Sequence, residues 1–411
     1  MNLSYRIKID TLITYLLYFY LLVDTVNGVL IRAGFFSISV LYKATIILLI
    51  VYIYKHRVQI YLPLYVLFIY FIVHMAISSD LSQTIQGLGW LFKTLSLFWF
   101  YFFFKEQVKN DNSGTIFKLA KYSFIILNLN MVIGVLGYGF SQYTGGIGVK
   151  GLIYAGNEIG LTIVVSSLIL LVNALSNNKY KQYLIILSIF LIVSILTTTK
   201  ATLFAFALIT VFFPLIKISN RPHFRFIKKK DFALTVLTYG VFPAILIFAI
   251  NYVLFSMGLW DRISFFYYSL GHSIFSIVLS GRDLLASLAF NEFLNYNPIE
   301  FLFGSGLSWT HIFDIPGKTG VEIDIVDYLM RYGIIGVLIP YGFLFAIILI
   351  AFKNRHTNPM YKYIVFSVLL IILISVTAGH VLYSGTAAPL LAALFALASY
   401  SPTTHQVIKY E

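Results

Sequence analysis

The chain of 411 residues is 59% hydrophobic and only 11% charged, and it contains no cysteine. Its mean hydropathy of +0.87 lies far outside the range of soluble domains of this length, so the composition excludes a soluble enzyme and indicates a membrane protein. The lack of cysteine excludes disulfides, thiolate nucleophiles and cysteine-bound metals.

Apolar segments long enough to cross the hydrocarbon layer recur along the whole chain, with short polar breaks between them. The first follows Arg6 and Lys8, as in a signal peptide, but no small-residue cleavage site comes after it, so we predict an uncleaved first helix. We therefore predict an all-α polytopic membrane protein with about twelve transmembrane helices. The predicted spans are residues 11–30, 37–54, 59–77, 87–104, 116–139, 157–175, 182–198, 201–216, 232–256, 324–351, 361–378 and 386–400.

The predicted spans divide the chain into three regions. Residues 1–256 hold the first nine transmembrane helices, residues 257–323 form one large loop, and residues 324–411 hold the last three helices and a short tail. The loop segment that begins at Ser280 is rich in apolar residues but is interrupted by polar ones such as Asn291, which predicts a helix lying against the membrane surface.

The charge distribution predicts which side of the membrane each loop occupies. If the N-terminus is cytoplasmic, the inner loops hold most of the lysines and arginines, including a cluster between Lys217 and Lys230. The positive-inside rule then places both termini in the cytoplasm and the large loop on the outer side. We therefore attribute much of the net charge of +13 to topology and to attraction of anionic lipids, and not to nucleic-acid binding.

Two cations of the outer regions stand where an anion is expected to bind. Ser280 and Asp283 have the spacing of a capping box, which predicts that Arg282 lies in the first turn of a helix beside free N–H groups. Lys200 follows a run of threonines and is predicted at the N-terminus of the eighth span. Either residue taken alone is also compatible with an ordinary loop charge.

The acidic residues Glu322 and Asp324 stand two positions apart where the tenth span begins. Acids are favoured at a helix N-terminus by the helix dipole, which is one interpretation. The other is a general base that accepts the proton of a sugar hydroxyl. Asp327 and Arg331 are four residues apart on the same predicted helix and are expected to form a structural pair.

Further charged residues have two interpretations each. Lys150 lies in a glycine-rich loop that begins at Thr144. One interpretation is that the backbone N–H groups of this loop bind phosphate with the help of Lys150, and the other is that the loop is a flexible linker. Asp24, Lys43 and Lys93 lie at similar depth in their spans, which predicts an internal ion-pair cluster and leaves a substrate role open.

No metal site and no cofactor is expected. The histidines outside the predicted inner loops lack the spacing of metal ligands and are interpreted as packed polar groups. They include His272, His311 and His380.

Several short motifs follow one another along the second half of the chain. They are YAGNEIG from Tyr154, TTTKAT from Thr197, SGRDLLASLAF from Ser280, FGSGLSW from Phe303 and VEIDIVDYLMRYGIIGV from Val321. Their order resembles that of the O-antigen polymerase (Wzy-type) and O-antigen ligase superfamily of bacterial envelope glycan assembly.

The resemblance implies a fold like that of the GT-C glycosyltransferases in the bacterial inner membrane. It also implies a polymerase that joins oligosaccharide repeat units, as in O-antigen or a related surface polysaccharide, carried on undecaprenyl pyrophosphate, at the periplasmic face. Arg282 and Lys200 match the family's basic positions thought to hold the pyrophosphate, and Asn157 matches the asparagine at the entry to a middle span. Arg262 is expected to contact the second lipid-linked substrate. The implied partners are that lipid-linked oligosaccharide, membrane lipids, a chain-length regulator and a flippase.

The chain departs from the family pattern at two places. Lysine replaces the usual arginine at position 200, which keeps the charge but loses bidentate phosphate geometry. Ligases of the superfamily typically carry a histidine just ahead of the span that begins here at about residue 324, whereas this chain has Glu322 and Asp324. This difference favours a polymerase over a ligase that transfers the glycan to a lipid A core.

A lipid-linked oligosaccharide flippase or other transporter is the alternative from another class. A transporter is expected to carry polar residues through the middle of the membrane and to show repeated halves. Here the informative charges gather toward one side, and no internal repeat is found.

Overall fold

The computed structural model describes residues 3–78, 80–110, 113–142, 148–154, 156–219, 279–313 and 319–401, with a few isolated residues between 240 and 276. Within these residues the chain is almost entirely helical, and eight helices are long and apolar enough to cross a membrane. The apolar helices are α1 (Leu3–Arg32), α2 (Ser39–Ile53), α3 (Leu62–Ser78), α4 (Leu81–Lys109), α5 (Gly114–Ile133), α6 (Gly156–Ser176), α7 (Tyr180–Thr197), α8 (Lys200–Ser219), α15 (Asp324–Lys353), α16 (Tyr361–Thr377) and α17 (Ala388–Ala396).

The helical, polytopic character predicted from the sequence is confirmed. Eleven of the predicted spans coincide with an apolar helix, although α1 and α4 begin several residues earlier than predicted. α2, α16 and α17 are shorter than the eight spanning helices. The predicted span at 232–256 lies mostly outside the described residues. The count of twelve spans and the likeness to the GT-C fold therefore stay predictions.

The glycine-rich loop adds a small ribbon to the otherwise helical chain. Strand β1 (Phe140–Ser141) pairs antiparallel with β2 (Val149–Gly151). Asn130 of α5 holds the second strand by accepting a hydrogen bond from the N–H of Leu152 at 2.8 Å and donating one to the carbonyl of Lys150 at 2.8 Å. This part of the loop is thus a fixed structure and not a flexible linker.

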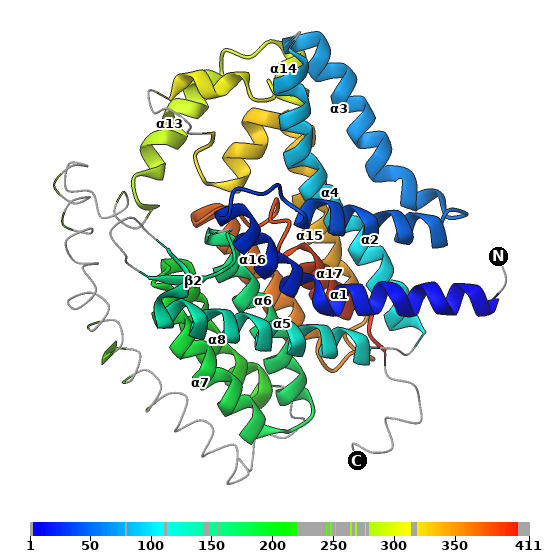
Figure 1. Ribbon diagram of the computed structural model, residues 1–411, viewed down its shortest axis with the longest axis vertical. Helices are drawn as coiled ribbons and strands as arrows, with labels where there is room; N and C mark the ends of the chain where they lie inside the picture. Colours follow the sequence, from blue (N-terminus) through cyan, green and yellow to red (C-terminus); the bar gives the residue numbers. More distant parts are fainter. Residues whose placement is uncertain are drawn as a thin grey trace.

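The centre of the bundle is formed by α17, α4 and α6 (Figure 1). α17 is rich in alanine, and all of its residues are buried. Small side chains let helix backbones approach closely, and in a membrane this close packing drives association because lipid already solvates apolar surface. The sequence of α17 therefore explains its central position.

The large loop contributes α13 (Arg282–Phe293) and α14 (Pro298–Phe303), which lie together at one end of the molecule, at the top of Figure 1. Asn297 caps α14 by accepting from the N–H groups of Ile299 and Glu300, and the Glu300 side chain completes a capping box. α14 packs against both α3 and α15, so the loop is fixed to the membrane helices.

A break in α15 provides the attachment point for this loop. Gly333 adopts φ 64° and ψ −165°, so the carbonyls of the preceding turn lose their helical partners. Three groups replace them: the N–H of Ser305 donates to the carbonyl of Met330 at 3.0 Å, that of Gly306 to Arg331 at 3.1 Å, and the Tyr70 hydroxyl to Tyr332 at 2.8 Å. Buried carbonyls need such partners. The motifs beginning at Phe303 and Val321 therefore meet through their backbones.

Candidate functional site

The first turn of α13 and the residue two positions before α15 meet in an ion pair. The Arg282 guanidinium donates from Nη2 to Oε2 of Glu322 at 2.6 Å. The Arg282 side chain is 19% exposed and that of Glu322 is 39% exposed, so solvent and a ligand can reach the pair. A charge-assisted hydrogen bond of this kind is strong and fixes the direction of both side chains.

Lys200 joins this pair through Ser280. Its Nζ donates to the Ser280 hydroxyl at 3.0 Å, and Ser280 stands two residues before Arg282. The predicted capping box is wrong: the N-cap of α13 is Gly281, at φ 76°, and no side chain caps the helix, whereas Asp283 accepts from the Ser276 hydroxyl. The predicted place of Arg282 in the first turn is confirmed. The two cations thus gather at the starts of α8 and α13.

The threonine run before Lys200 forms the turn that places it. Thr198 adopts φ 51° and ends α7, and α8 begins at Lys200. The hydroxyls of Thr197 and Thr199 both bond to the hydroxyl of Thr202, at 3.2 and 2.6 Å. These contacts let the chain reverse direction in a buried turn without leaving polar groups unpaired.

Glu322 is held in a strained backbone conformation that directs its side chain toward Arg282. Its φ of 67° lies in the left-handed region, which costs free energy unless the surroundings fix it. Asp327 supplies this fixation by accepting from the N–H of Val321 at 2.7 Å and from that of Glu322 at 3.1 Å. Gly379 approaches from the other side, where a Cβ atom would lie 2.3 Å from the Glu322 carbonyl oxygen.

Asp324, the alternative to Glu322 as a candidate base, is fully buried. Its Oδ2 accepts from the Ser375 hydroxyl at 2.9 Å and from the N–H groups of Val381 and Leu382 at 3.0 and 3.1 Å. These bonds attach the 381–382 segment to the start of α15. Of the two predicted carboxylates, the geometry therefore favours Glu322 for contact with a ligand.

Arg331 does not form the ion pair with Asp327 that its spacing predicts, within the described residues. It donates to the carbonyl of Thr319, and its guanidinium carbon lies 4.7 Å from the centre of the Trp90 ring. The Tyr383 hydroxyl instead donates to Asp327 at 3.2 Å. The shape of the loop before α15, and not the i, i+4 spacing, decides these partners.

Two functional candidates were missed by the sequence reasoning. His380, at φ 58°, lies close enough to Glu322, Glu158 and Arg282 for their charges to act on its imidazole. Burial lowers the pKa of His380 below its usual value, and the surrounding carboxylates oppose that shift. The imidazole is therefore neutral at pH 7 and can accept a proton.

Glu158 stands next to Asn157 in the first turn of α6. Its Oε2 accepts from the Ser384 hydroxyl at 2.9 Å and from the N–H of Thr386 at 3.1 Å, which connects α6 to the segment after α16. An acid in the first turn of a membrane helix is itself a recognisable sequence pattern, so Glu158 could have been found. No local pattern marks His380.

The remaining predicted residues do not join this cluster in the described structure. The amine of Lys150 donates to the Tyr154 carbonyl at 3.3 Å and lies 5.5 Å from the centre of the Phe140 ring, and burial lowers its pKa. Asn157 belongs to α6, but its side chain lies outside the described residues, as does all of Arg262. Their binding roles stay predictions.

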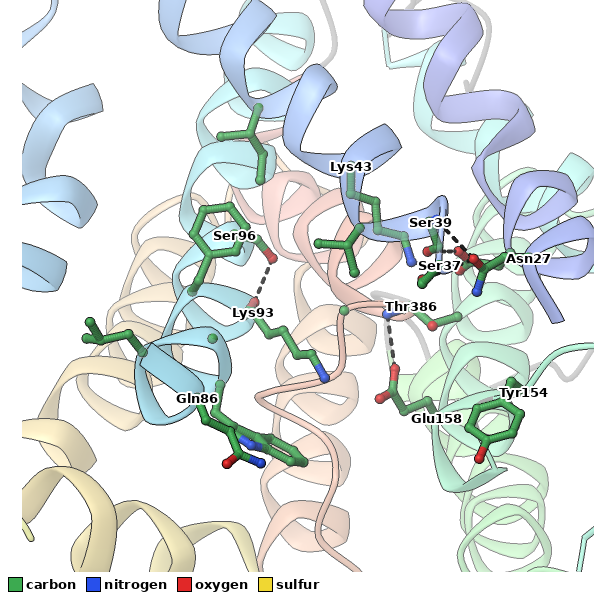
Figure 2. Close-up of a pocket in the computed structure, with 18 of the residues that line it drawn as sticks. Asn27, Ser37, Ser39, Lys43, Gln86, Lys93, Ser96, Tyr154, Glu158 and Thr386 are labelled. Carbon is green, nitrogen blue, oxygen red and sulfur yellow. Dashed lines mark hydrogen bonds and ion pairs between the residues drawn. The ribbon is translucent and has the colours of Figure 1, made fainter. Parts of the chain in front are cut away.

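The predicted cluster of Asp24, Lys43 and Lys93 is confirmed in part. Lys43 pairs with Asp24 at 2.7 Å. Lys93 stands apart from that pair, with its amine 4.6 Å from the centre of the Trp90 ring. All three line one cavity, into which Lys93 and Glu158 point from opposite sides (Figure 2).

No protein-family model and no curated protein matches the sequence. Among the described residues, no group of three or more histidine, aspartate or glutamate side chains is arranged to hold a metal ion. The arrangement instead offers two cations, an accessible carboxylate and a neutral imidazole near one another. These groups are suited to binding an anionic ligand and to moving a proton beside it.

Proposed function

We propose that the protein is a membrane glycosyltransferase that polymerises oligosaccharide units carried on a lipid pyrophosphate. The growing glycan is transferred from its own carrier to a hydroxyl of a second lipid-linked unit, at the outer face of the membrane. The observation that carries this proposal is the accessible Arg282–Glu322 pair, with Lys200 held beside it through Ser280. It combines cations for a leaving pyrophosphate with a carboxylate for an attacking hydroxyl.

In the proposed reaction the acceptor oxygen forms a bond to the anomeric carbon of the donor sugar. The bond from that carbon to the pyrophosphate oxygen breaks, and its electron pair leaves with the pyrophosphate. Arg282 and Lys200 stabilise the negative charge that grows on this leaving group. The hydroxyl proton passes to the Glu322 carboxylate, which needs only hydrogen-bond reach of the acceptor.

The ion pair itself suggests how donor binding prepares the base. The Glu322 carboxylate is neutralised by Arg282. A bound pyrophosphate competes for the same guanidinium, because phosphate oxygens also accept bidentate hydrogen bonds from arginine. Glu322 is then released from Arg282 and becomes available to the acceptor hydroxyl.

A glycan ligase is the second candidate, and His380 is the observation that favours it. Ligases of the resembling family typically carry a histidine just before the span that starts here at Asp324. In this chain His380 comes from another segment and lies beside Glu322, so an imidazole is present despite the changed sequence.

The deciding experiment deletes the gene and separates the envelope polysaccharide on a gel. A polymerase deletion is expected to leave core glycolipid carrying one repeat unit and no ladder, with the ladder restored by a plasmid copy. Loss of every repeat unit would instead support a ligase or a flippase, and an unchanged ladder would refute all three. A ligase deletion accumulates lipid-linked polymer at the outer face, whereas a flippase deletion does not.

A further inference from the structure

A cavity of about 900 Å³ lies between α1, α2, α3, α4 and the start of α6, beside the cluster described above (Figure 2). Its wall is mostly apolar. The apolar lining includes Ile47, Leu67, Phe68, Phe71, Leu88 and Phe92. Val40 of α2 and Phe68 of α3 also line the cavity and are 59% and 62% exposed, so it opens on the surface beside these two helices.

The surface onto which this cavity opens is the apolar outer side of membrane-embedded helices. α3 stands at the edge of the bundle (Figure 1). Most of its apolar side chains are not covered by other helices. In a membrane such side chains face lipid tails. The opening beside α2 and α3 therefore leads into the hydrocarbon layer.

The inner end of the cavity is polar and carries a cation. Lys93 enters it from α4, opposite Glu158, which is already held by Ser384 and Thr386. Among the residues that the structure describes, no carboxylate forms an ion pair with Lys93. The Trp90 ring beside the Lys93 amine also lies against a second cation, the guanidinium of Arg331 at 4.7 Å.

Lys43 provides the internal comparison, because it lines the same cavity but is neutralised by Asp24 at 2.7 Å. An amine inside the membrane region is costly unless an anion or water compensates its charge. A cation–π contact replaces only part of that compensation. An anionic group bound in the cavity would supply the rest at Lys93, whereas Lys43 needs none.

We propose that this cavity binds the phosphate headgroup of a polyprenyl-linked lipid, with Lys93 at the phosphate and the isoprenoid chain leaving between α2 and α3. Its volume is at the upper end of the range for small-molecule sites, roughly 300–1,000 Å³. The choice of the acceptor as the occupant rests on the proposed function, because that reaction consumes two lipid-linked units. Arg282 and Lys200 hold the donor, and Lys93 holds the acceptor lipid.

Two substitutions separate the charge of the site from its shape. Lys93→Met removes the charge but keeps most of the length of the side chain. Gly89→Leu fills the cavity from α4, and a Cβ atom at Gly89 would meet no heavy atom within 4 Å, so the larger side chain has room.

Matched controls are present in the same chain. Lys105 also lies on α4 with its amine against a ring, 5.6 Å from the centre of Tyr101, but it does not line the cavity, so Lys105→Met controls for Lys93→Met. Gly342 is an exposed helical glycine of α15 whose Cβ would also meet nothing within 4 Å, so Gly342→Leu controls for Gly89→Leu.

The test measures binding of a polyprenyl phosphate to the purified full chain in detergent by native mass spectrometry, with phosphatidylglycerol as the parallel ligand. Lys93→Met and Gly89→Leu are each expected to weaken polyprenyl phosphate binding about tenfold or more. The control variants are expected to bind as the unmodified chain does. Unchanged binding in both cavity variants would overturn the proposal, and so would equal affinity for phosphatidylglycerol.

This assay requires no turnover, so its outcome is independent of the deletion experiment. If binding depends on Lys93 but the polysaccharide ladder is unchanged in the deletion strain, the proposed function is refuted and the lipid site is still supported. Loss of the ladder in the deletion strain, together with unchanged polyprenyl phosphate binding in both cavity variants, would refute the lipid site alone.

Discussion

At the scale of single residues, the contact between Arg282 and Glu322 gives the first prediction. Arg282→Gln removes the cation but keeps a hydrogen-bond donor, and we expect the transfer rate to fall about 10²- to 10³-fold, as when one preorganised donor to a growing negative charge is lost. Arg282→Lys keeps the charge without the bidentate geometry and is expected to lose less. The measurement is the rate of glycan transfer between purified lipid-linked units.

Arg355→Gln serves as the control for Arg282→Gln, because this arginine is exposed after the far end of α15 and its side chain donates to the neighbouring His356. It is expected to leave the rate unchanged. An Arg282→Gln protein that transfers glycan at the normal rate would remove Arg282 from the proposed mechanism.

The second prediction concerns the stability that depends on His380. Burial lowers its pKa in the folded protein below the usual value of 6.5, so the unfolded chain binds the proton more readily. The free energy of unfolding is therefore expected to decrease as the pH falls below about 6.5, and to level off below the folded pKa. His380→Gln removes this contribution, so its loss of thermal stability between pH 7.5 and 5.5, measured by intrinsic fluorescence, is expected to be smaller.

His311→Gln tests whether this effect belongs to the site, because His311 is an exposed histidine of the large loop. The His311 variant is expected to lose stability on acidification as the unmodified chain does. Identical pH dependence in the His380 variant and the unmodified chain would show that the imidazole is not held in its neutral form.

Which residues could be predicted from the sequence depends on whether a local pattern marks them. Arg282, Lys200 and Glu322 carry charge beside predicted helix starts, and those starts follow from hydropathy. His380 reaches Glu322 only because Gly379 lets two backbones touch, and that contact has no local pattern. Asp324 and Glu322 are equivalent candidates for the general base in the sequence, because the sequence does not reveal which of the two acids becomes buried.

At the scale of secondary-structure elements, the break in α15 gives the third prediction. Gly333→Ala places a Cβ atom 2.3 Å from the backbone of Leu302, at a φ of 64° that L residues avoid. The backbone conformation alone costs about 1–3 kcal/mol, and the overlap with α14 adds to it. We expect a lower melting temperature in detergent and weaker protection of residues 298–306 in hydrogen exchange.

Gly342→Ala is the matched control, because this glycine lies in the same helix with open space around its Cβ position. Alanine is a better helix former than glycine, so this variant is expected to be unchanged or more stable by up to about 1 kcal/mol. Equal melting temperatures for the two variants would mean that the break does not hold the loop.

The positions of the apolar helices were predictable from the sequence, whereas the break and the ribbon were not. A membrane leaves few ways to satisfy backbone hydrogen bonds, so a long apolar segment has to be helical. In the sequence Gly333 resembles any other glycine of a membrane helix. The N–H groups of Ser305 and Gly306, which bond to the carbonyls just before the break, belong to a distant segment. Strands β1 and β2 depend in the same way on the Asn130 side chain.

At the scale of the whole molecule, the starts of α4, α6, α8 and α15 lie on one side of the bundle. Tyr332 near the start of α15 bonds to Gly87 of α4 at 2.7 Å, and Glu158 at the start of α6 bonds to the segment before α17. Lys200 begins α8, Glu158 lies in the first turn of α6, and Glu322 stands two residues before α15. This arrangement favours a reaction at one face of the membrane over transport across the membrane.

The last prediction assigns that face to the outside, as the distribution of lysine and arginine predicts. The natural chain has no cysteine, so a single introduced cysteine is the only site for a maleimide. Asn291 of α13 and His356 after α15 are both exposed. In intact cells a membrane-impermeant maleimide is expected to label Asn291→Cys and to label His356→Cys only after permeabilisation. The reverse pattern would place Arg282 in the cytoplasm, where lipid-linked units waiting on the outer face could not reach it.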